Sequence, residues 1–306
     1  MRQKIITIFG GSGFLGRYVA KALAAEGYAI QIVSRYPSRA AEVKVSGAVG
    51  QITLLKGDIR KNAEVQAAIA GSWAVVNLVG VLFERRRQSF AAIHAQGAER
   101  IAKLARESGV ERLIHISALG VDQPSGSHYA RSKRNGEKAV QAAFPDVTIL
   151  RPSIVFGPED DFFNRFANMA RFLPALPLIG GGKTRFQPVY AGDVAEAVRR
   201  CLTKPATIGQ TYELGGLHIY TFRELLEYIL QQTSRSCCLV NIPFPLASLE
   251  ASILEWFPKP LLTRDQVKLL HIDNVVSSEN SLQTLGITPR GIEQIVPTYL
   301  ARYRKP

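Results

Sequence analysis

The sequence predicts an α/β fold: a doubly wound parallel sheet followed by a smaller, mixed α/β C-terminal domain. Three observations support this prediction. Short β-branched runs alternate with helical apolar patterns over residues 1–150, a glycine-rich turn joins the first strand to the first helix, and the alternation weakens after Pro158. Alternating strands and helices are typical of parallel sheets, whose ligands bind at the carboxyl ends of the strands.

Composition is that of an ordinary globular chain. Of its 306 residues, 46% are hydrophobic and 21% are charged, which allows one large or two modest domains. No apolar run reaches the ~18–20 residues of a membrane span, and a strand pattern begins at the N-terminus, so we expect neither a span nor a targeting peptide. The three cysteines lack metal-ligand and disulfide spacing. This predicts a reducing compartment and no metal site.

The net charge of +13 lies mainly in residues 1–150, which contain 21 Lys and Arg against 11 Asp and Glu. An anionic cofactor does not require so much charge. The excess indicates either a solvated basic surface or a second anionic partner, such as a membrane surface or an acidic protein. We predict no nucleic-acid partner, because no nucleic-acid-binding motif is present. The basic run Arg85–Arg87 is the best single site for an acidic partner.

The strongest functional signal is the turn between the strand Ile5–Phe9 and the helical pattern that ends at Gly27. In such a turn Gly10 allows the sharp bend, Gly13 lets the backbone approach a pyrophosphate, and Gly16 lets the helix pack on the strand. The N–H groups of the first helical turn can then bind phosphate. The sequence therefore predicts a dinucleotide site on a Rossmann-type domain; the alternative is a βα turn without a ligand. The candidate residues are Gly10, Gly11, Ser12, Gly13, Phe14, Leu15 and Gly16.

The end of the second predicted strand favours NADP(H) over NAD(H). NAD sites often place an acidic side chain here to bind the ribose 2′-hydroxyl. Ser34 and Arg35 stand at this position instead, and a guanidinium can pair with a 2′-phosphate. The alternative is that Arg35 points into solvent.

Later strand ends supply further candidates for nucleotide contact. Asp58 is expected either to accept a hydrogen bond from the adenine amino group or to act as a turn residue. The set, in chain order, is Asp58, Ile59, Val79, Gly80 and Pro152.

Tyr129 and Lys133 are the candidate catalytic pair. They lie four residues apart at the start of a predicted helix, so they share one helix face. A lysine ammonium there can lower the pKa of the phenol and bind the nicotinamide ribose, which makes the phenol a proton donor or acceptor. Ser117, just past the fifth predicted strand, is the candidate for polarising a substrate carbonyl.

We predict that residues 1–157 form the nucleotide domain, with a return near 184–215, and that residues 158–306 form a smaller substrate or docking domain. Within the latter, the stretch Leu246–Phe257 has an apolar stripe. Core packing is favoured for this stripe, ahead of a docking helix or an interfacial membrane helix. Its members are Leu246, Leu249, Ile253, Trp256 and Phe257.

On these motifs the sequence resembles the extended and atypical short-chain dehydrogenase/reductase superfamily. The glycine turn, the Tyr129–Lys133 pair and residues 150–152 and 193–195 carry this resemblance. Residues 186–193, 262–267 and 273–277 are similar to the NAD(P)H-binding accessory subunit of respiratory complex I (NADH:ubiquinone oxidoreductase) and its bacterial homologues. The similarity covers nearly the whole chain.

The resemblance implies a tightly bound NADPH that is structural rather than turned over. It also implies a peripheral place on the cytoplasmic side of a bacterial inner membrane, with a role in assembly or stability near the membrane-arm junction. Gly10, Gly13, Gly16 and Arg35 would bind the phosphates, Asp58 would flank adenine, and Lys133 would hold the ribose.

Two departures from the catalytic superfamily bear on activity. Ala118 and Leu119 follow Ser117, and residues 94–97 read His-Ala-Gln-Gly where Asn-x-x-Gly is typical. Either change is expected to interrupt a proton relay. The alternatives are a free-standing NADP-dependent oxidoreductase or epimerase that uses Tyr129 and Lys133, and an NADPH-sensing regulator whose docking surface shifts with cofactor occupancy.

Overall fold

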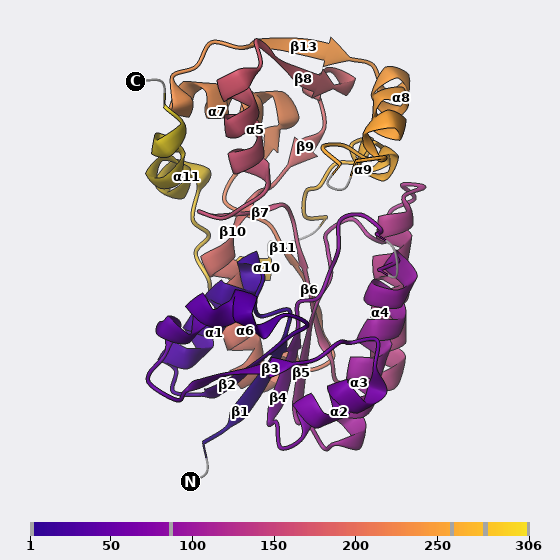
Figure 1. Cartoon of the computed structure of the whole chain (residues 1–306), viewed down its shortest axis with the longest axis vertical. Helices are drawn as coiled ribbons and strands as arrows, with labels where there is room; N and C mark the ends of the chain where they lie inside the picture. The colour runs from indigo at the N-terminus through magenta and orange to yellow at the C-terminus, as the bar shows by residue number, and fades with distance from the viewer. Residues whose placement is uncertain (1–2, 86–87, 258–259, 278–280, 305–306) are drawn as a thin grey trace.

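The computed structural model describes residues 3–85, 88–257, 260–277 and 281–304. A sheet flanked by helices forms the lower half in Figure 1, with the N-terminus beneath it. A smaller set of helices and short strands forms the upper half, where the C-terminus lies. Arg86 and Arg87 of the predicted basic run lie outside the described residues.

Within the described residues, seven parallel strands form the main sheet in the order β11-β6-β5-β4-β1-β2-β3. The order reverses between β1 and β4, and ligands bind at the carboxyl ends of strands at such a point. The predicted doubly wound fold class is confirmed. The strands are β1 (Ile5–Phe9), β2 (Ala29–Ser34), β3 (Ile52–Lys56), β4 (Ala74–Asn77), β5 (Arg112–Ile116), β6 (Thr148–Pro152) and β11 (Thr211–Leu214).

Helices cover both faces of this sheet because each presents an apolar stripe to it. On one face α1 and α6 pack together, and Val19 and Val198 join Ile8 in one core cluster. On the other face Ile101 and Val140 join Val75 in a second cluster. The helices are α1 (Phe14–Ala25), α2 (Asn62–Ile69), α3 (Ala98–Glu107), α4 (His128–Ala143) and α6 (Ala191–Thr203).

The sequence predicts one helix over residues 90–108, but a π-helical stretch, Ala91–Gly97, precedes α3. Helix α4 packs directly on this stretch. A Cβ at Gly136 would overlap the carbonyl oxygen of His94, so only glycine allows the close approach. π-Helical turns are frequent at functional sites, and His94 lies at the centre of this one.

The smaller domain has its own core, in which Phe163, Leu225 and Val296 are fully buried. Its helices are α5 (Phe162–Phe172), α7 (Phe222–Thr233), α8 (Phe244–Leu254), α9 (Arg264–Leu269) and α11 (Ile292–Leu300). Short α10 (Ser281–Thr284) lies between α9 and α11 in the chain. The strand pairs are β7 (Val155–Phe156) with β10 (Val189–Tyr190), β8 (Ala175–Ile179) with β13 (Cys238–Ile242), and β9 (Arg185–Phe186) with β12 (Tyr220–Thr221).

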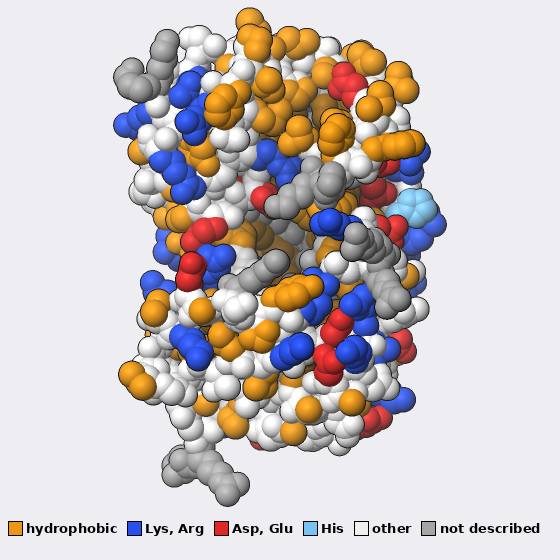
Figure 2. All heavy atoms as spheres, in the orientation of Figure 1, with side chains coloured by type: hydrophobic (Ala, Val, Ile, Leu, Met, Phe, Trp, Pro, Cys, Tyr) orange, Lys and Arg blue, Asp and Glu red, His pale blue; other side chains and the backbone are white. Residues whose placement is uncertain are grey.

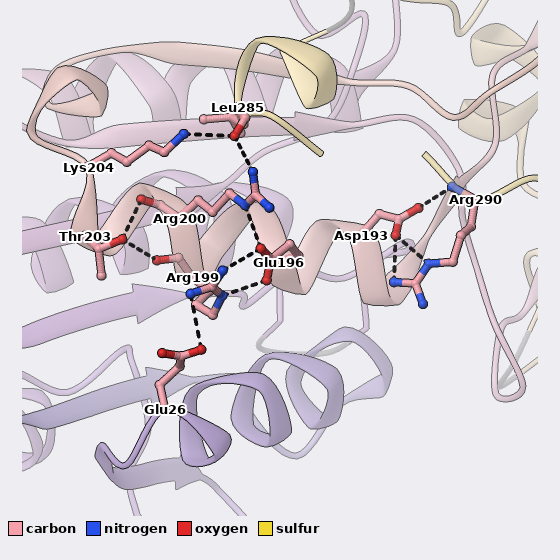
Figure 3. Close-up of polar contacts among 9 residues, drawn as sticks. All are labelled: Glu26, Asp193, Glu196, Arg199, Arg200, Thr203, Lys204, Leu285 and Arg290. Carbon is pink, nitrogen blue, oxygen red and sulfur yellow. Dashed lines mark hydrogen bonds and ion pairs between the residues drawn. The ribbon is translucent and has the colours of Figure 1, made fainter. Parts of the chain in front are cut away.

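The chain returns to the sheet domain after α9. Leu282, Leu285 and Ile287 are buried in the same cluster as α1 and α6. Side chains of α6 bind this returning segment (Figure 3): Arg200 Nη1 and Lys204 Nζ donate to the carbonyl oxygen of Leu285 at 2.8 and 3.0 Å.

Asp193, at the other end of α6, binds the chain just before α11. Its carboxylate accepts hydrogen bonds from the backbone N–H and Nε of Arg290, each at 2.8 Å (Figure 3). The two ends of α6 therefore hold the segment that leads back into the smaller domain.

Helix α8 does not bury its apolar stripe. Its buried side chains are Ala247 and Ala251, which pack on Ile179 and Val267. The larger apolar side chains are 47–89% exposed, so the core packing favoured from the sequence is wrong. Figure 2 shows hydrophobic side chains gathered over this end of the molecule. We call this surface the α8 patch; it consists of Leu246, Leu249, Ile253, Trp256 and Phe257. No helix in the described part of the chain has the length and apolarity to cross a membrane.

Candidate functional site

The glycine turn between β1 and α1 has the geometry that each glycine is expected to provide. Gly10 has a φ of +82°, in the left-handed region. A Cβ at Gly16 would lie 2.5 Å from the carbonyl oxygen of Gly10 and from Cα of Gly11, so α1 packs on the turn only with glycine there. A Cβ at Gly13 would have one contact within 4 Å among the described residues, the Gly10 oxygen at 3.3 Å. The outer side of Gly13 is therefore open.

The amino end of α1 faces this open side. Gly13 is the N-cap, and no side-chain cap hydrogen bond is formed there within the described chain. The first-turn N–H groups are thus available to an anion, which the helix dipole also favours. Ser12 Oγ donates to Ser34 Oγ at 3.3 Å, which joins the turn to the end of β2.

Past the ends of β2 and β3 the structure forms a cationic corner. Arg35 is exposed, and its charge helps to lower the pKa of the Asp58 carboxyl. The largest cause of that lowering is Arg60, whose Nε and Nη2 donate to the two carboxylate oxygens at 2.9 and 2.5 Å. The adenine contact predicted for Asp58 would therefore share its carboxylate with Arg60. Sequence reasoning missed Arg60, although its place two residues after Asp58 was a usable signal.

Two other predicted contact residues have structural partners of their own. The Ile59 side chain is buried in the core of the sheet domain, so it supports the site from beneath. The N–H of Val79 donates to Asn77 Oδ1 at 3.1 Å, which fixes the exit of β4. Neither side chain lines the cavity described next.

A cavity of about 680 Å³ lies between the two domains. The ends of β4, β5 and β6 and parts of α1 and α4 form one side, and α5, α7, α8 and α9 form the other. Figure 2 shows the hollow between the halves. It brings together Phe14, Leu15, Gly80, Ser117, Tyr129, Lys133 and Pro152. The other candidates lie outside its lining, at the carboxyl edge of β1 to β4: Gly10, Gly11, Ser12, Gly13, Gly16, Ser34, Arg35, Asp58, Ile59 and Val79.

Lys133 lies at the sheet end of the cavity and is 5% exposed. Its Nζ donates to the carbonyl oxygen of Ile116 at 2.9 Å. Burial lowers the pKa of this ammonium to about 8. A Cβ at Gly80 would lie 3.8 Å from Nζ, so the ammonium also faces the turn after β4.

The lowered pKa expected for the Tyr129 phenol is wrong, because other effects outweigh any contribution of Lys133. Burial and the carboxylate of Asp265 raise the pKa of the Tyr129 phenol to about 12. Desolvation penalises the charged phenolate, and this dominates at the cavity wall. Tyr129 is therefore a neutral phenol at physiological pH, suited to donate a hydrogen bond or a proton.

Ser117 is 4% exposed, and its Oγ has no hydrogen-bond partner among the described residues. A buried hydroxyl without a partner costs free energy, so it is suited to a ligand group in the cavity that it lines.

His94, which stands at the superfamily's asparagine position, is buried and neutral. Its Nε2 accepts from the N–H of Val81 at 3.0 Å, so its Nδ1 carries the proton and lies 2.8 Å from Ser132 Oγ. Burial is the main cause that lowers the pKa of the imidazole to about 3. His94 therefore ties the exit of β4 to α4 rather than carrying charge into the cavity.

Asp265 is a site residue whose role sequence reasoning did not assign. It lies on α9 of the smaller domain and caps α4 of the sheet domain. Its carboxylate accepts from Ser127 Oγ at 2.7 Å and from the N–H groups of His128 and Tyr129 at 2.6 and 2.9 Å. A carboxylate at a helix N-terminus is stabilising, so Asp265 positions the helix that carries Tyr129 and Lys133.

This arrangement fits a dinucleotide. The open side of Gly13 and the amino end of α1 would receive the pyrophosphate, and the corner at Arg35 would receive the adenosine end. Lys133 and the buried Ser117 hydroxyl stand at the other end, where both line the cavity. A nicotinamide nucleotide supplies hydride chemistry when bound, and a neutral Tyr129 phenol could hold or donate a proton there.

Comparison with known proteins agrees with this class of site. Residues 6–215 match the NAD dependent epimerase/dehydratase family, and the chain belongs to this family. Among solved structures, the dTDP-glucose 4,6-dehydratase of Streptomyces venezuelae, which contains NAD, has a TM-score of 0.75 at 19% identity. The match covers 98% of this chain and 96% of that one and shows the shared fold.

Curated relatives place the chain more closely. It is 35% identical to NADH dehydrogenase [ubiquinone] 1 alpha subcomplex subunit 9 of Arabidopsis thaliana, over 98% of this chain and 78% of that protein. The subunit of the same name from Mus musculus is also 35% identical, over 98% of this chain and 80% of its own length. A ceramide reductase of Caulobacter vibrioides is 32% identical over 79% of this chain and 74% of that protein. The predicted resemblance is confirmed.

Proposed function

We propose that this chain is an NADP(H)-binding accessory subunit of respiratory complex I, in which the nucleotide stabilises the fold and is not turned over. The observation that carries the proposal is the 35% identity to alpha subcomplex subunit 9 over 98% of the chain. That range includes the glycine turn, the interdomain cavity and the smaller domain with its α8 patch.

Charge at the end of β2 supports the preference for NADP(H). Arg35 follows the strand where an acidic side chain would bind a ribose 2′-hydroxyl, and the nearby carboxylate of Asp58 is paired with Arg60. A 2′-phosphate would meet the exposed guanidinium of Arg35, which can form charge-assisted hydrogen bonds, and the pairing of Asp58 with Arg60 offsets the negative charge that would repel it. A structural nucleotide agrees with His94, which replaces the superfamily's asparagine and is fully engaged in fixed hydrogen bonds.

The α8 patch is the feature that supports a location of the protein at the membrane surface. Leu249, Ile253 and Trp256 are 62–89% exposed on one end of the molecule, and side chains of this size are rarely clustered on a monomer surface without a function. Trp at such a position suits a membrane interface. We place this patch on the cytoplasmic face of a bacterial inner membrane, beside the membrane arm of the complex.

The test is native mass spectrometry of the protein from its own membranes, solubilised mildly without added nucleotide. We expect the chain to co-migrate with complex I subunits and to retain the mass of NADP(H). Arg35→Ala should lose that mass, while Arg106→Ala, an exposed residue in the last turn of α3, should keep it. Trp256→Gln should release the protein from the membrane, while Val49→Gln, an exposed apolar residue far from α8, should not.

A lone protein that exchanges NADP(H) freely would contradict the accessory-subunit function. It would favour the second candidate, a free-standing NADP-dependent oxidoreductase. The convergence of Tyr129, Lys133 and Ser117 on one cavity supports that candidate, as does the relationship to a ceramide reductase. It predicts that Tyr129→Phe abolishes consumption of NADPH with a carbonyl substrate while the nucleotide stays bound.

A further inference from the structure

The part of the cavity formed by the smaller domain is apolar. Its wall comes from α5, β8, α7 and α8, and a volume of about 680 Å³ is in the range of small-molecule sites, roughly 300–1,000 Å³. The principal wall residues are Phe162, Phe166, Met169, Ile179, Phe222 and Leu254. A ligand in this half would exchange water for hydrocarbon over most of its surface, so burial of apolar area would dominate its binding.

The charged groups of the lining disfavour an anionic ligand. The carboxylates among the described lining residues are Glu159, Asp161, Glu250, Asp265 and Asp273. Against these five stand Lys133, which donates to the carbonyl of Ile116, and Arg165, which donates to the carbonyl of Leu261 at 3.1 Å. Asp273 is also paired with Arg185 at 2.7 Å, which leaves four carboxylates against these two cations. The diphosphate of a sugar nucleotide would therefore still meet mainly like charge here. The solved neighbour named for dTDP-glucose therefore shares the fold but is a poor guide to the ligand of this cavity.

The sheet end of the cavity offers two uncharged polar groups. Ser117 Oγ is buried without a partner among the described residues, and the Tyr129 phenol is protonated at physiological pH. A hydroxyl can donate one hydrogen bond and accept others, and a phenol can do the same. A single carbonyl or hydroxyl on the ligand would satisfy both groups.

We propose that this cavity binds an uncharged long-chain lipid. Its carbonyl or hydroxyl head lies at Ser117 and Tyr129, and its hydrocarbon chain lies along the wall formed by α5 and α8. Helix α8 separates this chain from the outside: Leu254 lines the cavity, whereas Ile253 belongs to the exposed α8 patch. The inference goes beyond the proposed function, because it requires neither complex I nor turnover of the nucleotide.

The experiment measures equilibrium binding of 1-alkanols, from 1-hexanol to 1-decanol, to the purified nucleotide-loaded protein. Each added methylene should tighten binding about fourfold, the value for burying one CH₂ group. Leu254→Gln should weaken binding of 1-decanol at least tenfold. Ile253→Gln, the neighbouring residue on the same helix, should leave it unchanged. If Leu254→Gln does not fold, Met169→Gln on α5 tests the same wall.

Ser117→Ala tests the head-group end separately. It should weaken binding of every alkanol by the same factor, about two- to tenfold, and leave the dependence on chain length unchanged. An affinity that does not rise with chain length, or equal effects of Leu254→Gln and Ile253→Gln, would overturn the proposal. So would tight binding of a UDP-sugar that displaces 1-decanol.

The same samples separate the two proposals. Loss of NADP(H) during purification, with the chain-length dependence intact, would count against the accessory-subunit function alone. A flat chain-length dependence in nucleotide-loaded protein that co-migrates with complex I would count against the lipid site alone.

Discussion

The glycine turn and the interdomain cavity are built in opposite ways. Backbone geometry forms the turn: Gly10, Gly13 and Gly16 lie within one short segment, and each acts through the absence of a Cβ. Side chains from both domains form the cavity, from Phe14 in α1 to Asn274 near the C-terminus. The charges near the two regions also differ. The guanidinium of Arg35 lies near the turn, whereas the cavity has an apolar wall and a lining that contains carboxylates. The comparison shows that a glycine turn suited to phosphate can stand beside a ligand cavity whose lining is mainly apolar.

The largest effects are expected from substitutions in the glycine turn, where alanine at Gly16 and alanine at Gly13 should act on different properties. Gly16→Ala places a methyl group 2.5 Å from backbone atoms, so it should lower the free energy of unfolding by about 1–3 kcal/mol or more. Gly13→Ala meets one oxygen at 3.3 Å in extended backbone, and we expect the fold to survive. It should nevertheless weaken nucleotide binding about ten- to a hundredfold, because the methyl occupies space near the phosphate.

The pair is its own control. Chemical unfolding gives the stability of each variant, and titration with NADP⁺ gives its affinity. If Gly13→Ala binds nucleotide as tightly as the wild type does, the phosphate does not lie at the open side of Gly13. The description of the turn as a phosphate site would then be wrong.

Lys133, at the boundary of the two regions, gives a pH-dependent effect. Its pKa is lowered from 10.5 to about 8, so between these values the unfolded chain binds a proton that the folded chain does not. Its contribution therefore makes the free energy of unfolding rise with pH from about 8 to 10.5, by on the order of 3 kcal/mol. Below pH 8 the ammonium is protonated in both states, and this contribution is constant.

Lys133→Met should remove that rise, measured by urea unfolding of nucleotide-free protein across pH 7–10. Lys138→Met, exposed on the same helix, should keep the wild-type dependence. The same pH dependence in wild type and Lys133→Met would show that the ammonium is not desolvated at the cavity wall.

The smallest expected effect concerns Asp265, which links the two regions. Asp265→Asn removes the charge from three hydrogen bonds at the start of α4 and should cost about 1–2 kcal/mol of stability. It should also lower the pKa of the Tyr129 phenol, which the carboxylate helps to raise. Ultraviolet titration of the phenol measures this shift.

Asp161→Asn provides the control. Asp161 also lines the cavity and stands at the N-terminus of α5, but its side chain makes no cap hydrogen bond within the described chain. If both variants lose the same free energy of unfolding, the hydrogen bonds from Asp265 to the start of α4 do not contribute specifically to stability.

Local sequence patterns predicted the fold and the glycine turn because the evidence for each lies within a few residues. The strand Ile5–Phe9 was predicted at its observed bounds, and the second predicted strand ends at Ser34, as β2 does. Gly10 and Gly16 were predictable because a βα turn imposes the same steric limits in any sequence.

The rest depends on contacts between distant segments. Asp265 caps α4 from a position more than 130 residues away, and no local pattern indicates such a partner. The stripe on α8 has the same spacing whether it faces a core or solvent, and the alanines that pack inward decided the outcome. Tyr129 was expected to have a lowered pKa from its spacing to Lys133, but burial and Asp265, both tertiary effects, raise it.

The return of residues 282–287 to the sheet domain has a consequence for how the chain folds. Leu282, Leu285 and Ile287 complete the core beside α1, and Ile292 and Val296 of α11 then complete the core of the smaller domain. Both cores therefore depend on residues 282–296. Contacts between residues so distant in sequence slow folding, and because this one segment completes both cores, we expect the two domains to unfold together in a single cooperative transition.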